Sequence, residues 1–533
     1  MIHKLLIVFM LVLASCSEKQ QQSDSETELS VSSVSQSKTQ SEIAWHSGDL
    51  ESAFREAQAS DRPVFLYWGA EWCPPCNQLK ATLFKEPDFI ALTQFFVPVY
   101  LDGDTERAQI HGETYGVSGY PTLVVLTPDQ QELTRIPGGM DLQRYPEVLQ
   151  LVLQEQKPVS QIVENFQNGN SLSEKDFSVL ALYSWWQDRG QVLVEGEEES
   201  LLYALYQACP PSQSIAKSRL FSVWWYFLKN THLQQEGYVL SDEKKQVLLQ
   251  ESETILLNEE LIYNNLEFVL YDRGALLTLL DEQQERFIAM WYKALEKTQG
   301  NKSLPLLAQL TPIRTKIYLE NPGKEPEAFT VSPTLKQEII DTVETTRKSK
   351  LKSYEHSVVM NLFWYMLTTA GLYEEADRIF KEELANSDAP YYFMVDVAQS
   401  AQELGRHEEA LEWLQRAYEE AKDGATKFQW GVMYLEGAVE MFPEKKELIV
   451  TIAQDVLGQL HNREDAFFNR NQLRAKRIEK ALLTWNEQGI YDAELRTVAT
   501  SLKGLCGNWQ QQPEGENYQR CSALLASLEK SST

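Results

Sequence analysis

The sequence predicts an α/β domain followed by a much larger all-helical region. Strand and helix signals alternate over residues 42–157, which is the pattern of an α/β domain. From Pro158 to the end the pattern is helix after helix, with no convincing strand run. A short sequence repeat within this part indicates that some of its helices form repeated pairs.

Composition excludes one broad class of function. The chain has 533 residues, 43% of them hydrophobic, which is enough for several packed units. Its formal net charge of −28 is spread along the chain rather than gathered in a tail. Because such a surface repels nucleic acid, we expect no nucleic-acid partner.

Residues 1–15 read as a signal peptide. Lys4 precedes an apolar run, Leu5 to Leu13, that is too short to span a bilayer. The following Leu13-Ala14-Ser15-Cys16 resembles a bacterial lipobox, which implies cleavage before Cys16 and its lipidation. Ser17 follows in place of aspartate, which by the sorting rule of Gram-negative lipoproteins implies an outer-membrane lipoprotein that faces the periplasm. The alternative is an ordinary secretory signal with a chance cysteine.

No later segment has 18 consecutive apolar residues, so no spanning helix is expected.

The remaining boundaries follow from composition and pattern. Residues 16–41 are mostly polar and predict a flexible tether. Within the domain the expected elements are, in order, a helix over Asp49 to Ala59, a strand over Val64 to Trp68, a helix from Cys73 to about Phe84, a strand over Phe96 to Leu101, a helix near Arg107 to Tyr115, strands over Thr122 to Thr127 and Glu132 to Ile136, and a helix from Asp141 to about Gln156. The helical part divides into residues 158–350, repeats over 351–460, and a C-terminal region over 461–533.

The sequence Trp72-Cys73-Pro74-Pro75-Cys76 predicts a redox site. Cys73 precedes a proline, which disfavours helical dihedrals and suits a residue just outside a helix. Pro74 and Pro75 fit the first helical turn, where a missing N–H costs nothing. Cys76 then lies one turn further, so both sulfurs reach the same helix end. The helix N-terminus favours a thiolate on Cys73.

A strand, a Trp-Cys-x-x-Cys helix and, about 45 residues later, Gly-Tyr-Pro-Thr before another strand resemble the thioredoxin family. The resemblance covers about 115 residues. It implies a cis peptide bond before Pro121, which would lie beside the cysteine pair, and a backbone at Tyr120 that pairs with an extended substrate. Trp72 is expected to contact substrate as well. Asp61-Arg62-Pro63-Val64 and the segment from Leu83 to Asp88 also look like the reductase domains of bacterial transmembrane electron transporters.

The sequence departs from the family at two places. Tyr67 stands six residues before Cys73, where thioredoxin has a buried aspartate that deprotonates the second cysteine. Glu71 or a water remains open as the base for Cys76. The Pro-Pro between the cysteines replaces thioredoxin's Gly-Pro, and this pair tunes the reduction potential, so the direction of electron flow is not readable.

The cysteine pair has three interpretations. A zinc site would need a second ligand pair at metal spacing, and the seven histidines are scattered. A purely structural disulfide would close too small a loop to constrain the chain. The third is a redox-active dithiol, with Cys73 as nucleophile and Cys76 as resolving thiol. We expect this one, with no cofactor and no metal.

One repeat is visible in the helical part. Gly371-Leu372-Tyr373-Glu374-Glu375-Ala376 recurs 34 residues later as Gly405-Arg406-His407-Glu408-Glu409-Ala410. It resembles the tetratricopeptide repeat, in which the glycine ends the first helix and the alanine lets the second pack against it. Generic helical packing is the alternative, above all for residues 158–350. The aromatic clusters of this part are interpreted as helix–helix packing.

The other cysteines are given structural roles. Cys506 and Cys521 are expected to form a disulfide that closes a loop containing Pro513 and two glycines. Cys209 is expected to be a buried, inert thiol.

These observations predict a membrane-anchored, extracytoplasmic thiol–disulfide oxidoreductase, a reductase or isomerase rather than an oxidase. It would act on protein disulfides and exchange electrons with a redox partner protein, while its helical repeats bind partner proteins. The alternative is a lipoprotein scaffold in which both regions only bind proteins and the cysteine pair performs no catalysis.

Overall fold

A computed structural model describes residues 42–137, 144–232, 238–271, 273–387, 389–422 and 424–531. The predicted signal peptide, Cys16 and the tether lie outside the described residues, as does the glycine pair after residue 137. In the part of the chain that is described, no helix combines the length and apolar character needed to cross a membrane.

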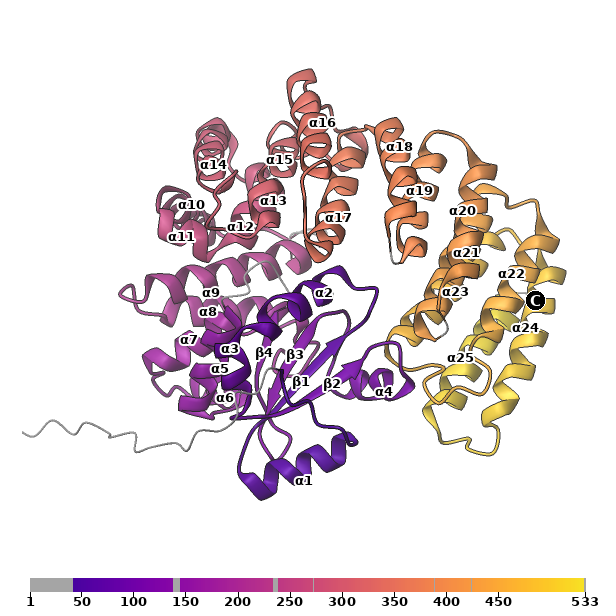
Figure 1. The fold of residues 1–533 in the computed structure, drawn as a ribbon, viewed down its shortest axis with the longest axis horizontal. Coiled ribbons are helices and arrows are strands. Elements are labelled where there is room, and N and C mark those ends of the chain that lie inside the picture. Colours follow the sequence, from indigo (N-terminus) through magenta and orange to yellow (C-terminus); the bar gives the residue numbers. More distant parts are fainter. Residues whose placement is uncertain are drawn as a thin grey trace, which may run out of the picture. The chain divides into compact units, whose positions relative to one another are not determined.

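A four-stranded mixed sheet forms the centre of the N-terminal domain, in the order β2-β1-β3-β4 (Figure 1). Its strands are β1 (Val64–Gly69), β2 (Val97–Asp102), β3 (Thr122–Leu126) and β4 (Glu132–Pro137). Strand β1 pairs in parallel with β2 and antiparallel with β3, and β4 runs antiparallel to β3. The helices of the domain are α1 (Leu50–Ser60), α2 (Pro74–Ala81), α3 (Pro87–Thr93), α4 (Glu106–Thr114) and α5 (Arg144–Glu155).

Strand β1 is buried along its whole length because the sheet is covered on both faces. Side chains alternate between the faces of a strand. Phe65 and Tyr67 accordingly join the core beneath α2, α3 and α5, whereas Leu66 and Trp68 join the core beneath α1 and α4. The continuous apolar run that predicted a buried strand is therefore confirmed.

The helix after the cysteines is shorter than predicted. Helix α2 ends at Ala81, and a 3-10 turn over Leu83–Lys85 follows it. Thr82 has non-helical dihedrals, and its hydroxyl donates a hydrogen bond to the carbonyl of Gln78, which closes the helix. Helix α3, which sequence reasoning missed, then begins at Pro87, a residue suited to a first helical turn.

The rest of the described chain is helical, which confirms the predicted succession of an α/β domain and an all-helical region. The helices are α6 (Val159–Gln167), α7 (Glu174–Leu182), α8 (Glu198–Ala208), α9 (Ser214–Phe227), α10 (Asp242–Leu257), α11 (Glu259–Asn264), α12 (Leu266–Tyr271), α13 (Arg273–Thr278), α14 (Gln284–Thr298), α15 (Leu306–Leu319), α16 (Pro333–Arg347), α17 (Ser353–Thr369), α18 (Tyr373–Glu383), α19 (Pro390–Glu403), α20 (His407–Glu420), α21 (Ala425–Met441), α22 (Lys446–Gly458), α23 (Asn469–Trp485), α24 (Asp492–Cys506) and α25 (Glu516–Ser531).

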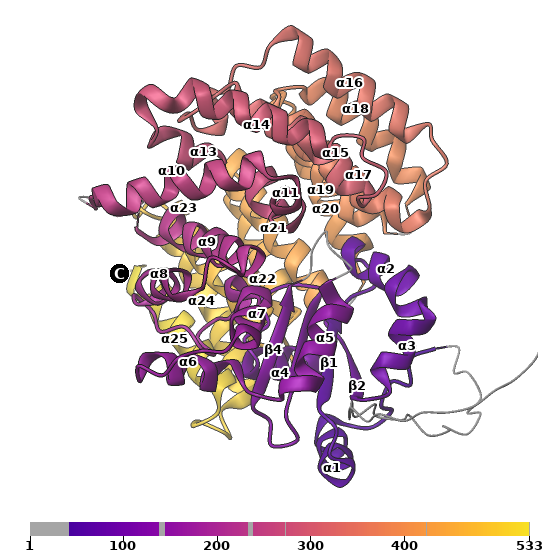
Figure 2. The same ribbon diagram turned by 90° about the vertical axis from the view of Figure 1, so that its left-hand side faces the viewer.

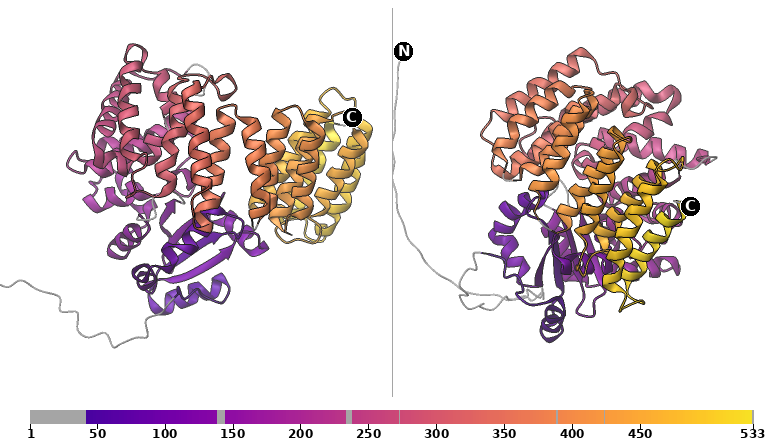
Figure 3. Two further views of the ribbon diagram at one scale, coloured as in Figure 1. Left: turned by 45° about the horizontal axis from the view of Figure 1, so that its top comes forward. Right: turned by 90° about the vertical axis from the view of Figure 1, so that its right-hand side faces the viewer.

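The sequence repeat corresponds to two helix pairs, α17–α18 and α19–α20. Gly371 and Gly405 lie between the helices of each pair with φ of 68° and 72°, a conformation that glycine adopts without strain. Ala376 and Ala410 are fully buried, as close helix packing requires. Neighbouring helices from α18 to α22 pack against each other (Figure 3). Assignment to the tetratricopeptide family itself stays a prediction.

Most aromatic clusters of the helical region are packing residues, as predicted. Trp185, Trp224 and Trp291 are at most 1% exposed. Tyr365 is the exception, with 42% of its surface exposed. This ring lines a cavity beside the predicted redox site, as described below.

The helical region contacts the α/β domain at several places. Helices α6 and α7 lie against β4 and α5 (Figure 2). Further along the chain, α17 packs on α2 and α23 packs on α4. Because α2 carries the cysteine pair, the helical region reaches the predicted redox site directly.

Candidate redox site

The cysteine pair begins helix α2 as the sequence pattern predicts. Cys73 is the N-cap residue with extended dihedrals, and Pro74 occupies the first helical position. The backbone N–H of Cys76 donates to Cys73 Sγ at 3.3 Å. The two residues form a disulfide with Cα atoms 5.3 Å apart, so the site is in its oxidised state. Cys73 is 2% exposed and Cys76 is fully buried.

Tyr120 and Pro121 are joined by a cis peptide bond. The Tyr120 hydroxyl donates to the carbonyl of Gly103 at 2.9 Å and accepts from Gln109 Nε2 at 3.0 Å. Only glycine fits at position 103, because a Cβ there would lie 2.1 Å from the Tyr120 ring. Tyr120 packs against the cysteine cluster, so this loop and α2 meet at the disulfide.

Trp72 is held by residues of the helical region as well as by its own domain. Its Nε1 donates to Asp104 Oδ2 at 2.7 Å, and its ring stacks on Tyr392 of α19, with centroids 6.3 Å apart. The guanidinium of Arg470, from α23, lies 5.0 Å from the Trp72 ring and 5.1 Å from the Tyr120 ring. Such cation–π geometry is favourable at partly buried sites.

Asp104 joins these contacts into one network. Its Oδ1 accepts a hydrogen bond from Thr426 of α21 and pairs with Arg470 Nη1 at 3.4 Å. The backbone N–H of Arg470 donates in turn to Gln109 Oε1 at 3.2 Å. Helices α19, α21 and α23 therefore all contact the loops around the disulfide.

Two residues bear on the base for Cys76, namely Tyr67, which replaces the family's acid, and Glu71, which is the candidate base in this chain. Tyr67 occupies the position of the family's buried acid, and burial raises the pKa of its hydroxyl far above the usual value. Its hydroxyl oxygen is buried with no hydrogen-bond partner in the described structure. Glu71 is exposed and pairs with Lys422, whose ammonium lowers the pKa of the Glu71 carboxyl. A carboxylate whose pKa is lowered in this way is a weak proton acceptor.

Asp102 is a carboxyl that sequence reasoning missed. It lies at the end of β2, opposite Gly69 in the parallel ladder. By strand alternation it shares with Tyr100 the sheet face that α2 covers. Burial raises the pKa of Asp102. A partly buried acid with a raised pKa, on the sheet face covered by the helix that carries the cysteines, is a candidate for proton transfer.

A cavity of about 360 Å³ opens beside Cys73. From the α/β domain it is lined by Trp72, Cys73, Pro74, Pro75 and Tyr120. The helical region supplies Tyr271, Leu307, Arg314, Val358, Asn361, Leu362, Tyr365 and Tyr392. Its volume lies within the range typical of ligand pockets.

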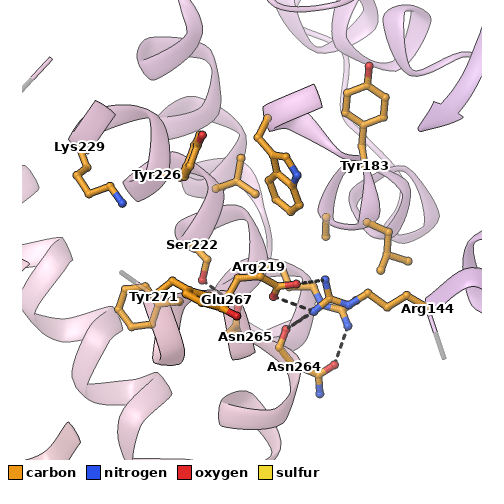
Figure 4. Close-up of a pocket in the computed structure, with 15 residues that line it drawn as sticks. Arg144, Tyr183, Arg219, Ser222, Tyr226, Lys229, Asn264, Asn265, Glu267 and Tyr271 are labelled. Carbon is orange, nitrogen blue, oxygen red and sulfur yellow. Dashed lines mark hydrogen bonds and ion pairs between the residues drawn. The ribbon is translucent and has the colours of Figure 1, made fainter. Parts of the chain in front are cut away.

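A separate apolar pocket of about 320 Å³ lies among α5, α7, α9 and α12 (Figure 4). Arg144 reaches both carboxylate oxygens of Glu267 at 3.3 Å, and Arg219 donates to Asn264 Oδ1 at 2.8 Å. These arginines are already engaged by protein groups, so the pocket suggests no charged ligand.

The other cysteines lie outside the redox site. Cys506 and Cys521 form a disulfide that joins α24 to α25, with Cα atoms 5.6 Å apart. Cys209 is a buried free thiol, and burial raises its pKa to about 11. Such a thiol is a poor nucleophile at neutral pH.

Residues 50–153 match the family model described as a thioredoxin-like domain. The chain thus contains a thioredoxin-like domain with a cysteine pair at the start of its second helix, followed by a large helical region. A search of curated proteins finds no match for the chain.

Proposed function

We propose that the chain is a thiol–disulfide oxidoreductase that reduces or isomerises disulfides in other polypeptides through Cys73 and Cys76. The observation that carries this proposal is the placement of Cys73 as N-cap of α2, bonded to Cys76 and beside the Tyr120–Pro121 loop. A helix N-terminus lowers the pKa of a thiol and so supplies the attacking thiolate.

The reaction proceeds in two exchanges. The Cys73 thiolate attacks one sulfur of the client disulfide, which forms a mixed disulfide and releases the other client sulfur as a thiolate. Cys76, after losing its proton, attacks Cys73 Sγ, forms the Cys73–Cys76 disulfide and releases the second client thiolate. The client gains two electrons and two protons. A dithiol donor protein restores the reduced pair by the reverse exchanges.

Asp102 is the proposed proton acceptor for Cys76, in place of the aspartate that Tyr67 replaces. Support comes from its raised pKa and from its position on the sheet face under α2. A carboxyl with a raised pKa is a stronger base once ionised, and it also returns the proton more readily in the reverse exchange.

Anchoring of the chain by a lipid on Cys16, at the periplasmic face of the outer membrane, is the second part of the proposal. Its support is the Leu-Ala-Ser-Cys sequence at the end of the apolar run. Replacement Cys16→Ser should release the protein from the membrane fraction, and unchanged fractionation would refute the anchor.

The test of catalysis is the reduction of a disulfide-bonded peptide by the full chain in the presence of a dithiol donor. We expect turnover by the wild type and none by Cys73→Ser or Cys76→Ser. If the wild type reduces the peptide no faster than the two variants or the donor alone, the alternative of a binding scaffold holds. The reduction potential then gives the direction, since about −270 mV favours a reductase and about −120 mV an oxidant.

A further inference from the structure

The cavity beside Cys73 joins the redox site to the helical region. It contains Cys73 in its wall, and Tyr271, Arg314, Tyr365 and Tyr392 come from four different helices, α12, α15, α17 and α19. Since Cys73 is only 2% exposed, a client disulfide must enter a confined space to meet its sulfur. A surface disulfide of a rigid folded protein does not fit that requirement, whereas an extended segment does.

The lining of this cavity is mostly aromatic and aliphatic. Five aromatic residues, Trp72, Tyr120, Tyr271, Tyr365 and Tyr392, line it together with three aliphatic residues. Rings of this kind provide apolar surface at low conformational cost, and tyrosine hydroxyls add polar contacts at the edges. The cavity therefore suits a peptide that carries an apolar side chain.

Arg314 gives the cavity a specific polar group. Its guanidinium lies over the ring of Tyr365, 5.0 Å from the centroid, and its Nε is buried with no hydrogen-bond partner. Its second ring contact is Tyr318, at 5.8 Å, and within the described residues no carboxylate pairs with it. The Arg314 side chain is partly removed from water and its charge has no anionic partner, which is unfavourable, and the geometry of a guanidinium matches a carboxylate.

We propose that this cavity binds an extended peptide segment in which an acidic residue adjoins the disulfide-bonded cysteine, with the carboxylate paired to Arg314. The inference names the client class of the proposed function. It rests on that function for the fate of the disulfide, while binding of the acidic segment is an independent property.

Binding is measured first with peptides that cannot react. Two synthetic probes carry serine in place of cysteine and differ only in the neighbouring residue, glutamate or glutamine. We expect the full-length wild type to bind the glutamate probe about tenfold more tightly in calorimetry, and Arg314→Gln to bind both alike. Arg314→Lys should retain part of the preference, because it keeps the charge and loses the planar fork.

The matched control is Arg416→Gln. Arg416 also lies over an aromatic ring, Trp413, at 4.4 Å, but it pairs with Glu420 and does not line the cavity. It should leave the preference unchanged. Thermal unfolding of each variant shows that the fold is retained.

The inference is wrong if the wild type binds the two probes equally, if it binds neither, or if Arg314→Gln keeps the preference. Cysteine versions of the probes, linked as disulfides, test the proposed function separately. A glutamate probe that binds through Arg314 but is never reduced would refute the oxidoreductase and leave the binding site intact.

Discussion

The indole of Trp72, next to the proposed nucleophile, stacks on Tyr392 of α19 with the two ring planes 25° apart. One residue belongs to the thioredoxin-like domain and the other to the helical region. Together with Arg470 and Asp104, this contact makes the helical region part of the redox site. We therefore expect mutations far along the chain to change the chemistry of Cys73.

The first prediction concerns Tyr392 itself. Tyr392→Leu keeps apolar volume but removes the aromatic stack on Trp72, which is worth about 0.5–1.5 kcal/mol beyond buried area. We expect a fall in kcat/KM for a disulfide peptide of roughly tenfold at most, equivalent to about 1.4 kcal/mol.

The control for this prediction is Tyr434→Leu. Tyr434 stacks on Tyr418 at 6.4 Å, with planes 28° apart, inside the repeat helices. This variant should lower the melting temperature without changing kcat/KM. Equal loss of activity in both variants would mean that general destabilisation, and not the contact with Trp72, is responsible.

The second prediction concerns Asp104, which accepts hydrogen bonds from Trp72 and Thr426 and pairs with Arg470. Asp104→Asn removes the charge and so weakens hydrogen bonds to a charged group, each worth about 1.5–3 kcal/mol. We expect Trp72 to lose its fixed position, and the intrinsic fluorescence and kcat/KM to change together. The control is Glu436→Gln, which weakens the ion pair between Glu436 of α21 and Arg477 of α23. It should change neither the fluorescence nor kcat/KM.

The third prediction is a pH dependence from Asp102. Its pKa is raised by burial in the folded state, so the folded protein holds this proton more tightly than the unfolded chain. Stability from this group is therefore full below its ordinary carboxyl pKa and is lost as pH rises through the raised value.

Asparagine does not ionise, so Asp102→Asn removes this loss of stability at higher pH. We expect the variant to be more stable than the wild type at pH 7, with the difference shrinking as the pH falls toward the ordinary carboxyl range. It should also slow the attack of Cys76 on a preformed mixed disulfide, measured by rapid quenching. A variant less stable at pH 7 with unaltered resolution would contradict both roles of Asp102.

The fourth prediction concerns the disulfide between Cys506 and Cys521, which are 15 residues apart in the sequence. Closing a loop of that length contributes about 3 kcal/mol in the chain-entropy model. The double change to serine should lower the free energy of unfolding of the helical region by roughly that amount. Cys209→Ala removes the buried free thiol and is the comparison for loss of a cysteine as such. The double variant should still reduce disulfides through Cys73. Two free thiols at Cys506 and Cys521 in the native protein would refute the pairing.

The parts of the site that depend on local sequence could be predicted. Cys73 is recognisable as an N-cap because the prolines that follow restrict the backbone, and the strand Val64 to Trp68 follows from its apolar run. Helix α3 was missed because seven residues with one turn of apolar pattern give a weak periodic signal.

The parts that depend on distant contacts could not be predicted. Nothing in the sequence around Arg470 or Tyr392 distinguishes them from other residues of amphipathic helices, since their partners are fixed only by how α19 and α23 pack. Asp102 was passed over for a similar reason. It reads as part of an Asp-Gly-Asp turn, and only the sheet register places it opposite Gly69.

The most direct test of the redox assignment is to trap its intermediate. A Cys76→Ser variant of the full chain, incubated with a disulfide-bonded peptide, should accumulate a covalent adduct that thiol reductants release. Mass spectrometry should locate that adduct on Cys73, and the Cys73→Ser variant should form none. Absence of an adduct on Cys73, or an equal yield of adduct on Cys209, would contradict the assignment of Cys73 as the nucleophile.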